Sequence, residues 1–66
     1  MIGSNLKLIC DKRNITMYRV SKETGISQSY LSDLVNGKAV NPSLEVLIKL
    51  SDFLRIPIAE LLNERA

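Results

Sequence analysis

The sequence predicts an all-α domain of five short helices around one core. Apolar residues recur at spacings of three and four along most of the chain, and no stretch alternates with a period of two for long enough to indicate a strand. Favourable N-cap residues precede three of these stretches (Thr16, Ser27, Ser43), and glycines follow two of them. A chain of 66 residues with 45% apolar content makes one domain, residues 1–66, with a small core.

The first predicted helix covers residues of about 4–13 and ends at Asn14. Its apolar face consists of four residues at helical spacing: Ile2, Leu6, Ile9 and Cys10. The second helix, residues 17–24, begins after the N-cap Thr16 and ends at Gly25. Its inward face is expected to carry Val20, Ser21 and Thr24.

The third helix, residues 28–36, is bracketed by Ser27 as N-cap and by Gly37 in left-handed geometry just past its end. Only residues 25–27 separate it from the second helix, which predicts a helix-turn-helix over about 16–36. The expected buried stripe consists of Leu31, Leu34 and Val35. The remaining face is polar, with amides and hydroxyls that suit the reading of base edges or phosphates: Gln28, Ser29, Ser32, Asp33 and Asn36.

The fourth helix is expected from its N-cap Ser43 to about Leu54, after a loop that contains Pro42. Its inward positions are predicted to be Leu44, Leu47, Ile48, Leu50, Ser51 and Leu54. Pro57 stands at the start of a fifth helix, where its missing N–H costs nothing. The apolar side of that helix is expected to carry Ile58, Leu61 and Leu62.

Composition excludes several classes of function. With no histidine and one cysteine, no zinc site or histidine-based triad can be assembled, and we expect neither an enzyme nor a cofactor. No apolar run approaches the ~20 residues of a membrane span, and no signal peptide opens the chain, so a cytoplasmic protein is expected. The net charge is +2, divided as +3 over residues 1–40 and −1 over residues 41–66. This bias toward the polar helix is weak support for nucleic acid.

Taken in order, these motifs resemble the helix-turn-helix domain of the phage repressor and Cro type, the XRE family. The resemblance runs from Ile2 to Leu62 and depends on short matching segments: Ile15-Thr16, Gly25-Ile26-Ser27, Leu31 with Leu34, Asn36-Gly37-Lys38, Asn41-Pro42-Ser43-Leu44-Glu45 and Ala59-Glu60-Leu61-Leu62. It implies a lambda-repressor-like five-helix domain that binds operator DNA as a two-fold dimer and regulates transcription. Repression is expected over activation, because a bare DNA-binding domain can block polymerase by occupancy.

The resemblance places base-reading side chains at Gln28, Ser29 and Asp33. The Gln28 amide can pair with N6 and N7 of adenine together. For Asp33 three interpretations remain open: its carboxylate accepts from cytosine N4, excludes wrong bases, or faces away from DNA.

The resemblance also implies contacts to the DNA backbone from helix ends and a few hydrogen-bond donors: Thr16, Met17, Tyr30, Ser32, Asn36, Lys38 and Ser43. Tyr30 is equally compatible with packing between helices, and the Ser32 hydroxyl with simple solvation. Two departures from the family pattern bear on affinity. Met17 replaces a glutamine that commonly clamps phosphate, and residues 39–43 lack the usual Lys or Arg. Backbone affinity is therefore expected to be low, with a shallow salt dependence.

Two further predictions concern apolar residues. Relatives with a buried ion pair carry Arg and Glu where this chain has Cys10 and Val35, so we expect these two to pack together in the core. A homodimer is expected through Phe53, Pro57, Ile58 and Leu62, which predicts a near-palindromic operator. The alternative function is an antitoxin-like or other protein-interaction module that binds DNA only for autoregulation.

Overall fold

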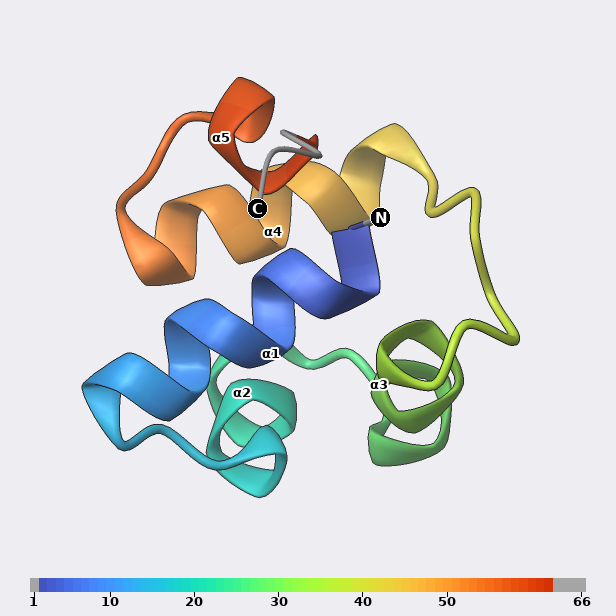
Figure 1. Ribbon diagram of the computed structural model, residues 1–66, viewed down its shortest axis with the longest axis horizontal. Coiled ribbons are helices and arrows are strands. Elements are labelled where there is room, and N and C mark those ends of the chain that lie inside the picture. The colour runs from blue at the N-terminus through green and yellow to red at the C-terminus, as the bar shows by residue number, and fades with distance from the viewer. Residues whose placement is uncertain (1, 63–66) are drawn as a thin grey trace.

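The structure, a computed structural model, describes residues 2–62 and contains five α-helices in that range: α1 (Ile2–Arg13), α2 (Met17–Thr24), α3 (Gln28–Val35), α4 (Leu44–Leu54) and α5 (Ile58–Leu62) (Figure 1). No strand occurs among these residues, which confirms the all-α class. None of the helices in this range is long and apolar enough to cross a membrane.

Side-chain hydroxyls cap the helices where the sequence predicts it. Each accepts a hydrogen bond from the amide three residues further on: Thr16 from Arg19 (3.1 Å), Ser27 from Tyr30 (3.1 Å) and Ser43 from Val46 (3.3 Å). Each bond satisfies one of the amides that a helix start leaves without an acceptor, which fixes the first residue of α2, α3 and α4.

The first four helices are each followed by a residue with positive φ: Asn14 (57°), Gly25 (80°), Gly37 (81°) and Arg55 (59°). At α3 the Lys38 amide then bonds to the Asp33 carbonyl (2.8 Å) and turns the chain out of the helix. The ends at Asn14, Gly25 and Gly37 confirm the predictions. Arg55 was not expected, because an L-residue with a Cβ is disfavoured in left-handed geometry.

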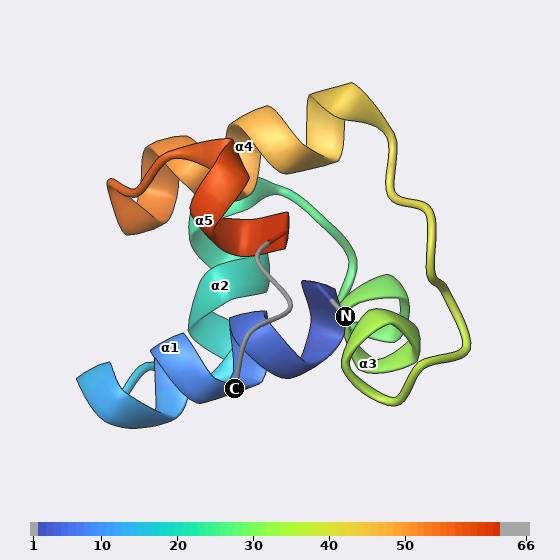
Figure 2. The same ribbon diagram turned by 45° about the horizontal axis from the view of Figure 1, so that its top comes forward.

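Helix α1 packs against α3 and α5, whereas α2 packs against α3 and α4 (Figures 1 and 2). The apolar side of α1 enters the core, whose buried members are Ile2, Leu6, Cys10, Val20, Ile26, Leu31, Leu34, Leu50, Leu54, Ile56 and Leu61. Two polar side chains of α1 bind the C-terminal ends of its neighbours. Asn5 donates to the Leu61 carbonyl (2.8 Å), and Arg13 donates to the Leu54 carbonyl (2.6 Å). These bonds satisfy carbonyls that the ends of α4 and α5 leave without an amide.

Gly3 is buried where α1 packs against the end of α3. A Cβ at this position would overlap the Leu34 carbonyl oxygen, lie 2.8 Å from the Leu34 carbonyl carbon and lie 3.1 Å from the Val35 Cα. The backbones of the two helices therefore approach as closely as glycine allows. No pattern in the sequence around Gly3 predicts this role.

One helix start and one helix face differ from the expectations. Helix α1 begins at Ile2 rather than near residue 4. On α4, Leu44 is 66% and Ile48 44% exposed, although both were predicted to point inward. The buried side of α4 centres on Leu50 and Leu54 and includes the half-buried Val46 and Phe53, which face α2 and α3. Helix α4 is therefore rotated about its axis relative to the expected orientation, and its edge with Leu44 and Ile48 lies in solvent.

Candidate nucleic-acid interface

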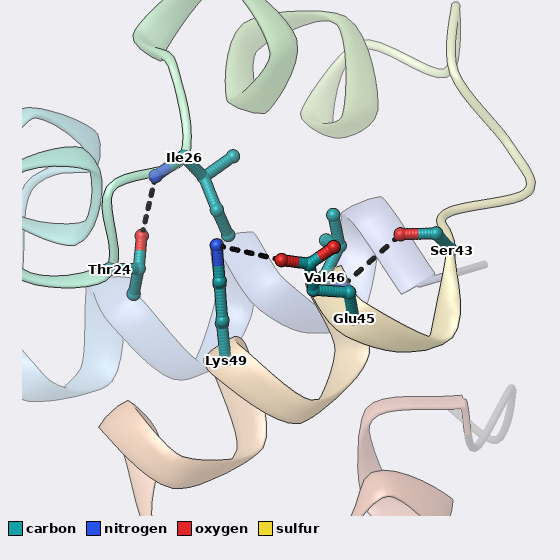
Figure 3. A network of polar contacts seen from close by, with 6 residues as sticks. All are labelled: Thr24, Ile26, Ser43, Glu45, Val46 and Lys49. Atoms are coloured by element: carbon teal, nitrogen blue, oxygen red, sulfur yellow. Dashed lines mark hydrogen bonds and ion pairs between the residues drawn. The ribbon is translucent and has the colours of Figure 1, made fainter.

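Residues 25–27 connect α2 to α3 and hold the two helices in contact. Gly25 reverses the chain in left-handed geometry, and the side chain of Ile26 is buried beneath the turn. The Ile26 amide donates to Thr24 Oγ1 (3.2 Å), as Figure 3 shows, and Ser27 then caps α3. A glycine, a buried apolar anchor and a cap in three consecutive residues make the short connection of a helix-turn-helix, as predicted.

Helix α3 turns a polar face to solvent. Leu31 and Leu34 are fully buried, and Val35 is half-buried. On the opposite side Gln28, Ser29, Ser32 and Asn36 are exposed, and Asp33 is half-buried. The structure thus brings the three predicted base-reading residues, Gln28, Ser29 and Asp33, onto one accessible face.

Hydrogen bonding divides this face into two groups. Asn36 Nδ2 donates to Ser32 Oγ (3.3 Å), one helical turn back, so each of these two side chains already has one partner on this face. Within residues 2–62, the side chains of Gln28, Ser29 and Asp33 have no hydrogen bond or ion pair. The side chains that the resemblance assigns to base reading are therefore those that are free to bind a ligand.

Several predicted backbone-contacting groups surround α3. Thr16 and Ser43 are exposed, and because their oxygens accept the capping bonds, their hydroxyl protons remain available to donate. The amides of Met17 and Tyr18 have no acceptor within α2, since they belong to its first turn. Lys38 is exposed directly after the end of α3. Met17 itself is half-buried against the core, so only its amide is available to an anion.

A cleft of about 520 Å³ lies between the start of α3 and the start of α4. Its lining residues are Ile26, Ser27, Tyr30, Asn41, Ser43, Glu45, Val46 and Lys49. Figure 3 shows Lys49 paired with Glu45 across one turn of α4 (3.4 Å), beside the Ser43 cap. Tyr30 is half-buried and packs against the core, which supports a packing role for this residue. It also lines the cleft.

Cys10 is fully buried, as predicted. It lines a cavity of about 400 Å³ with Val35 and Met17, at the junction of α1, α2 and α3. Burial raises the pKa of its thiol, the nearby Asp11 carboxylate raises it further, and Arg13 opposes both. Two apolar residues therefore occupy the place of the ion pair that the family resemblance suggested.

The four residues predicted for the dimer interface differ in exposure. Pro57 is exposed and Leu62 is 46% exposed, whereas Ile58 is half-buried. Phe53 is half-buried, packs against the core and lines a cleft with residues of α2. The more exposed apolar side chains of α4 are Leu44 and Ile48, which were predicted to point inward.

The arrangement defines a helix-turn-helix domain, and comparison with known proteins agrees. The chain belongs to the XRE-type helix-turn-helix family, whose family model, described as "Helix-turn-helix", matches residues 6–61. Among the relatives, it is 31% identical over 65 residues to the HTH-type transcriptional regulator SinR of Bacillus licheniformis, covering 98% of this chain and 59% of SinR. It is 33% identical over 63 residues to SlrR of Bacillus subtilis, another HTH-type transcriptional regulator, covering 96% of this chain and 41% of SlrR. The chain thus spans less than two thirds of the length of these relatives.

Solved structures give the same result. The fold superposes on the N-terminal DNA-binding domain of SinR from Bacillus subtilis with a TM-score of 0.91 at 29% identity, covering 98% of this chain and 94% of that one. It superposes on SinR in complex with DNA with a TM-score of 0.90 at 28% identity, covering 96% of this chain and all of that one.

Proposed function

We propose that this chain is a sequence-specific double-stranded DNA-binding transcriptional regulator that inserts α3 into the major groove. The observation that carries the proposal is the solvent-facing side of α3, where Gln28, Ser29 and Asp33 are accessible and have no partner within residues 2–62. Amide, hydroxyl and carboxylate groups are those that read base edges. The likeness to a SinR domain solved with DNA supports the same role for this fold.

The DNA backbone is bound by hydrogen-bond donors that flank α3. These donors precede and follow the reading helix along the chain. Before it come the Thr16 hydroxyl and the amides at the start of α2, and after it come the Lys38 ammonium and the Ser43 hydroxyl. Asn36, Ser32 and Tyr30 contribute at the edges of the face. Because Lys38 is the only cation in this set, the salt dependence is shallow, with a slope of about −2 for a dimer that neutralises one phosphate per protomer.

Two copies bind a near-palindromic operator, and occupancy of that site represses transcription. The exposed apolar residues near the end of the chain, Pro57 and Leu62, support pairing through α5, and the exposed Ile48 extends the apolar surface on α4. Half-sites about 34 Å apart place both reading helices on one side of the duplex.

Selection of bound duplexes from a random pool, followed by titration of the recovered site, tests DNA reading. Gln28→Ala should weaken binding about 5- to 150-fold per half-site, because each protomer loses one bidentate base contact. Glu23→Gln, an exposed change near the end of α2, is the control and should bind as the wild type does. Equal affinity of Gln28→Ala and wild type for every sequence would contradict major-groove reading by α3.

Sedimentation with and without the operator tests the dimer. Leu62→Asp and Ile48→Asp should each shift the protein toward monomer, because a charge in the apolar contact would lose its hydration. Leu8→Asp is the matched control, since Leu8 is 53% exposed on α1 and lies outside the proposed contact. A wild-type protein that stays monomeric even on a two-site operator would refute the dimer and leave DNA reading intact.

The alternative, an antitoxin-like or other interaction module, is not favoured, because the relatives are described as transcriptional regulators. SinR has also been solved in complex with the SinI protein, with a TM-score of 0.89 to this chain at 30% identity, covering 97% of this chain and 62% of that one. A failed duplex selection would make a protein partner the leading interpretation.

A further inference from the structure

We propose that each half-site is defined by an adenine read by Gln28 and a cytosine read by Asp33, about two base pairs apart, with no guanine read through its O6 and N7 atoms. The proposal rests on the function proposed above and specifies the DNA that the reading helix selects. Three observations support it. They are the residue types on the polar face of α3 (the reading face: Gln28, Ser29, Ser32, Asp33 and Asn36), the lack of polar partners for three of these side chains, and helix geometry.

The inventory excludes the commonest specific contact to guanine. That contact requires Arg or Lys, which donate to the two acceptors O6 and N7. Residues 28–36 contain neither. Lys38, the nearest cation along the chain, follows the left-handed residue Gly37, where the chain has already turned out of α3. The reading face therefore carries a charge of −1 and donates only through amides and hydroxyls.

The Asp33 carboxylate has a base preference that follows from its chemistry. It is half-buried and, within residues 2–62, has no hydrogen bond or ion pair, so no structural contact accounts for it. An ionised carboxylate only accepts hydrogen bonds, and the major groove offers donors only on cytosine N4 and adenine N6. Adenine places the N7 acceptor beside its donor, which repels the second carboxylate oxygen. In the base pair, adenine N6 lies between two acceptors, its own N7 and thymine O4, whereas cytosine N4 has an acceptor, guanine O6, on one side only and is the favoured partner.

Gln28 has the complementary preference. Its amide both donates and accepts, and its side chain is exposed without a partner within residues 2–62. It matches the N6 donor and N7 acceptor of adenine together. Gln28 and Asp33 are five positions apart, which is a rise of about 7.5 Å along the helix axis. With base pairs about 3.4 Å apart, a helix lying along the groove places the two contacts about two base-pair steps from each other.

The neighbouring positions on the face are less selective. The Asn36 amide donates one N–H to Ser32 Oγ and lies at the C-cap of α3, the end of the helix remote from Gln28. Ser29 is free, but a hydroxyl both donates and accepts and so tolerates several bases. The motif should therefore show two strong positions per half-site rather than three or four.

Parallel duplex selections with wild type, Asp33→Gln and Glu23→Gln test the assignment. The wild type should enrich adenine and cytosine about two steps apart, and Asp33→Gln should replace the cytosine by adenine in the same register. Glu23→Gln, which removes one exposed negative charge from α2, should keep the wild-type motif. This control separates specificity from a general gain in attraction to DNA. Thermal unfolding of each variant verifies that the fold is retained.

Base analogues in the selected duplex test individual atoms. Replacing the Gln28 adenine by 7-deazaadenine should weaken binding on the order of 10-fold, since one of two hydrogen bonds is lost. Replacing guanines by 7-deazaguanine should change affinity by less than about 2-fold, because no cation of α3 reads N7. A 10-fold loss with 7-deazaguanine, or cytosine retained by Asp33→Gln, would overturn this proposal while leaving DNA binding established. A selection that enriches no site would overturn the proposed function as well.

Discussion

Substituting Gly3 by alanine tests how α1 positions the reading helix. A Cβ at this position would overlap the Leu34 carbonyl oxygen and lie 2.8 Å from the carbonyl carbon. Carbon atoms in ordinary contact are about 3.5–4.0 Å apart, so the two helices would have to separate by about 1 Å. The opposing atoms belong to the backbone of α3, which cannot rotate out of the way as a side chain can.

The net effect of Gly3→Ala is a balance of two contributions. Alanine is favoured over glycine in a helix by about 1 kcal/mol. Forcing an extra carbon into a packed contact typically costs about 1–3 kcal/mol, and more where backbone must move. Because the contact at Leu34 is closer than any that a Cβ normally makes, we expect the steric contribution to dominate. The free energy of unfolding should fall by about 1–2 kcal/mol, which lowers Tm by roughly 4–15 °C in a domain of this size.

Thermal and urea unfolding followed by circular dichroism measure this effect, and Ser4→Ala is the matched control. Ser4 is exposed on the same turn of α1, so its replacement should change the free energy of unfolding by less than about 0.5 kcal/mol. A Gly3→Ala protein as stable as the wild type, or more stable, would refute the close approach of α1 to α3. Binding of the variant to a selected duplex then reports whether a shift of α3 also costs affinity.

The further predictions concern two helix ends, at Arg55 and Asn14, and the buried Cys10. Arg55→Gly should raise the free energy of unfolding by about 0.5–1 kcal/mol, because it relieves left-handed strain at φ 59°. Asn14→Gly should give a smaller gain, since Asn tolerates this geometry. Denaturant titration measures both. Iodoacetamide should modify Cys10 in urea but not in the native protein, and rapid native-state modification would contradict its burial. Burial and Asp11 raise the pKa of the Cys10 thiol in the folded protein. The stability that this shift provides should be complete below the unfolded pKa of about 8.5 and be lost as pH rises through the folded pKa. Cys10→Ala should remove that pH dependence.

Helix boundaries were predictable because the signals that set them are local. Thr16, Ser27 and Ser43 each satisfy an amide within their own helix, so the contact can be inferred from residue type and position. Gly25 and Gly37 adopt positive φ for a similarly local reason. The boundary at Arg55 lacked such a signal. There the buried Ile56, whose amide bonds to the Ser51 carbonyl (3.2 Å), holds a residue in a conformation that its own sequence disfavours.

Contacts between helices were less predictable. The stripe on α4 is apolar over more than half of its circumference, so periodicity alone could not decide which edge faces α2 and α3 and which edge, with Leu44 and Ile48, faces solvent. Gly3 illustrates the same limit. A glycine near the start of a helix has no pattern of its own, and its importance depends on the carbonyl of Leu34, which is distant in sequence.

The reading face combines both kinds of information. Helical spacing from Leu31 and Leu34 identified its five polar residues, but only the structure shows that Ser32 and Asn36 bond to each other. The contacts that hold α3 in place, by contrast, are made on its other side, by its buried side chains Leu31 and Leu34 and by its backbone at Leu34 against Gly3. Because the free side chains on the reading face make no hydrogen bond or ion pair within residues 2–62, substitutions there should change which DNA is bound while leaving the free energy of unfolding nearly unchanged. Substitutions at Gly3 should do the opposite, so measuring stability and specificity on the same set of variants separates positioning of α3 from reading by it.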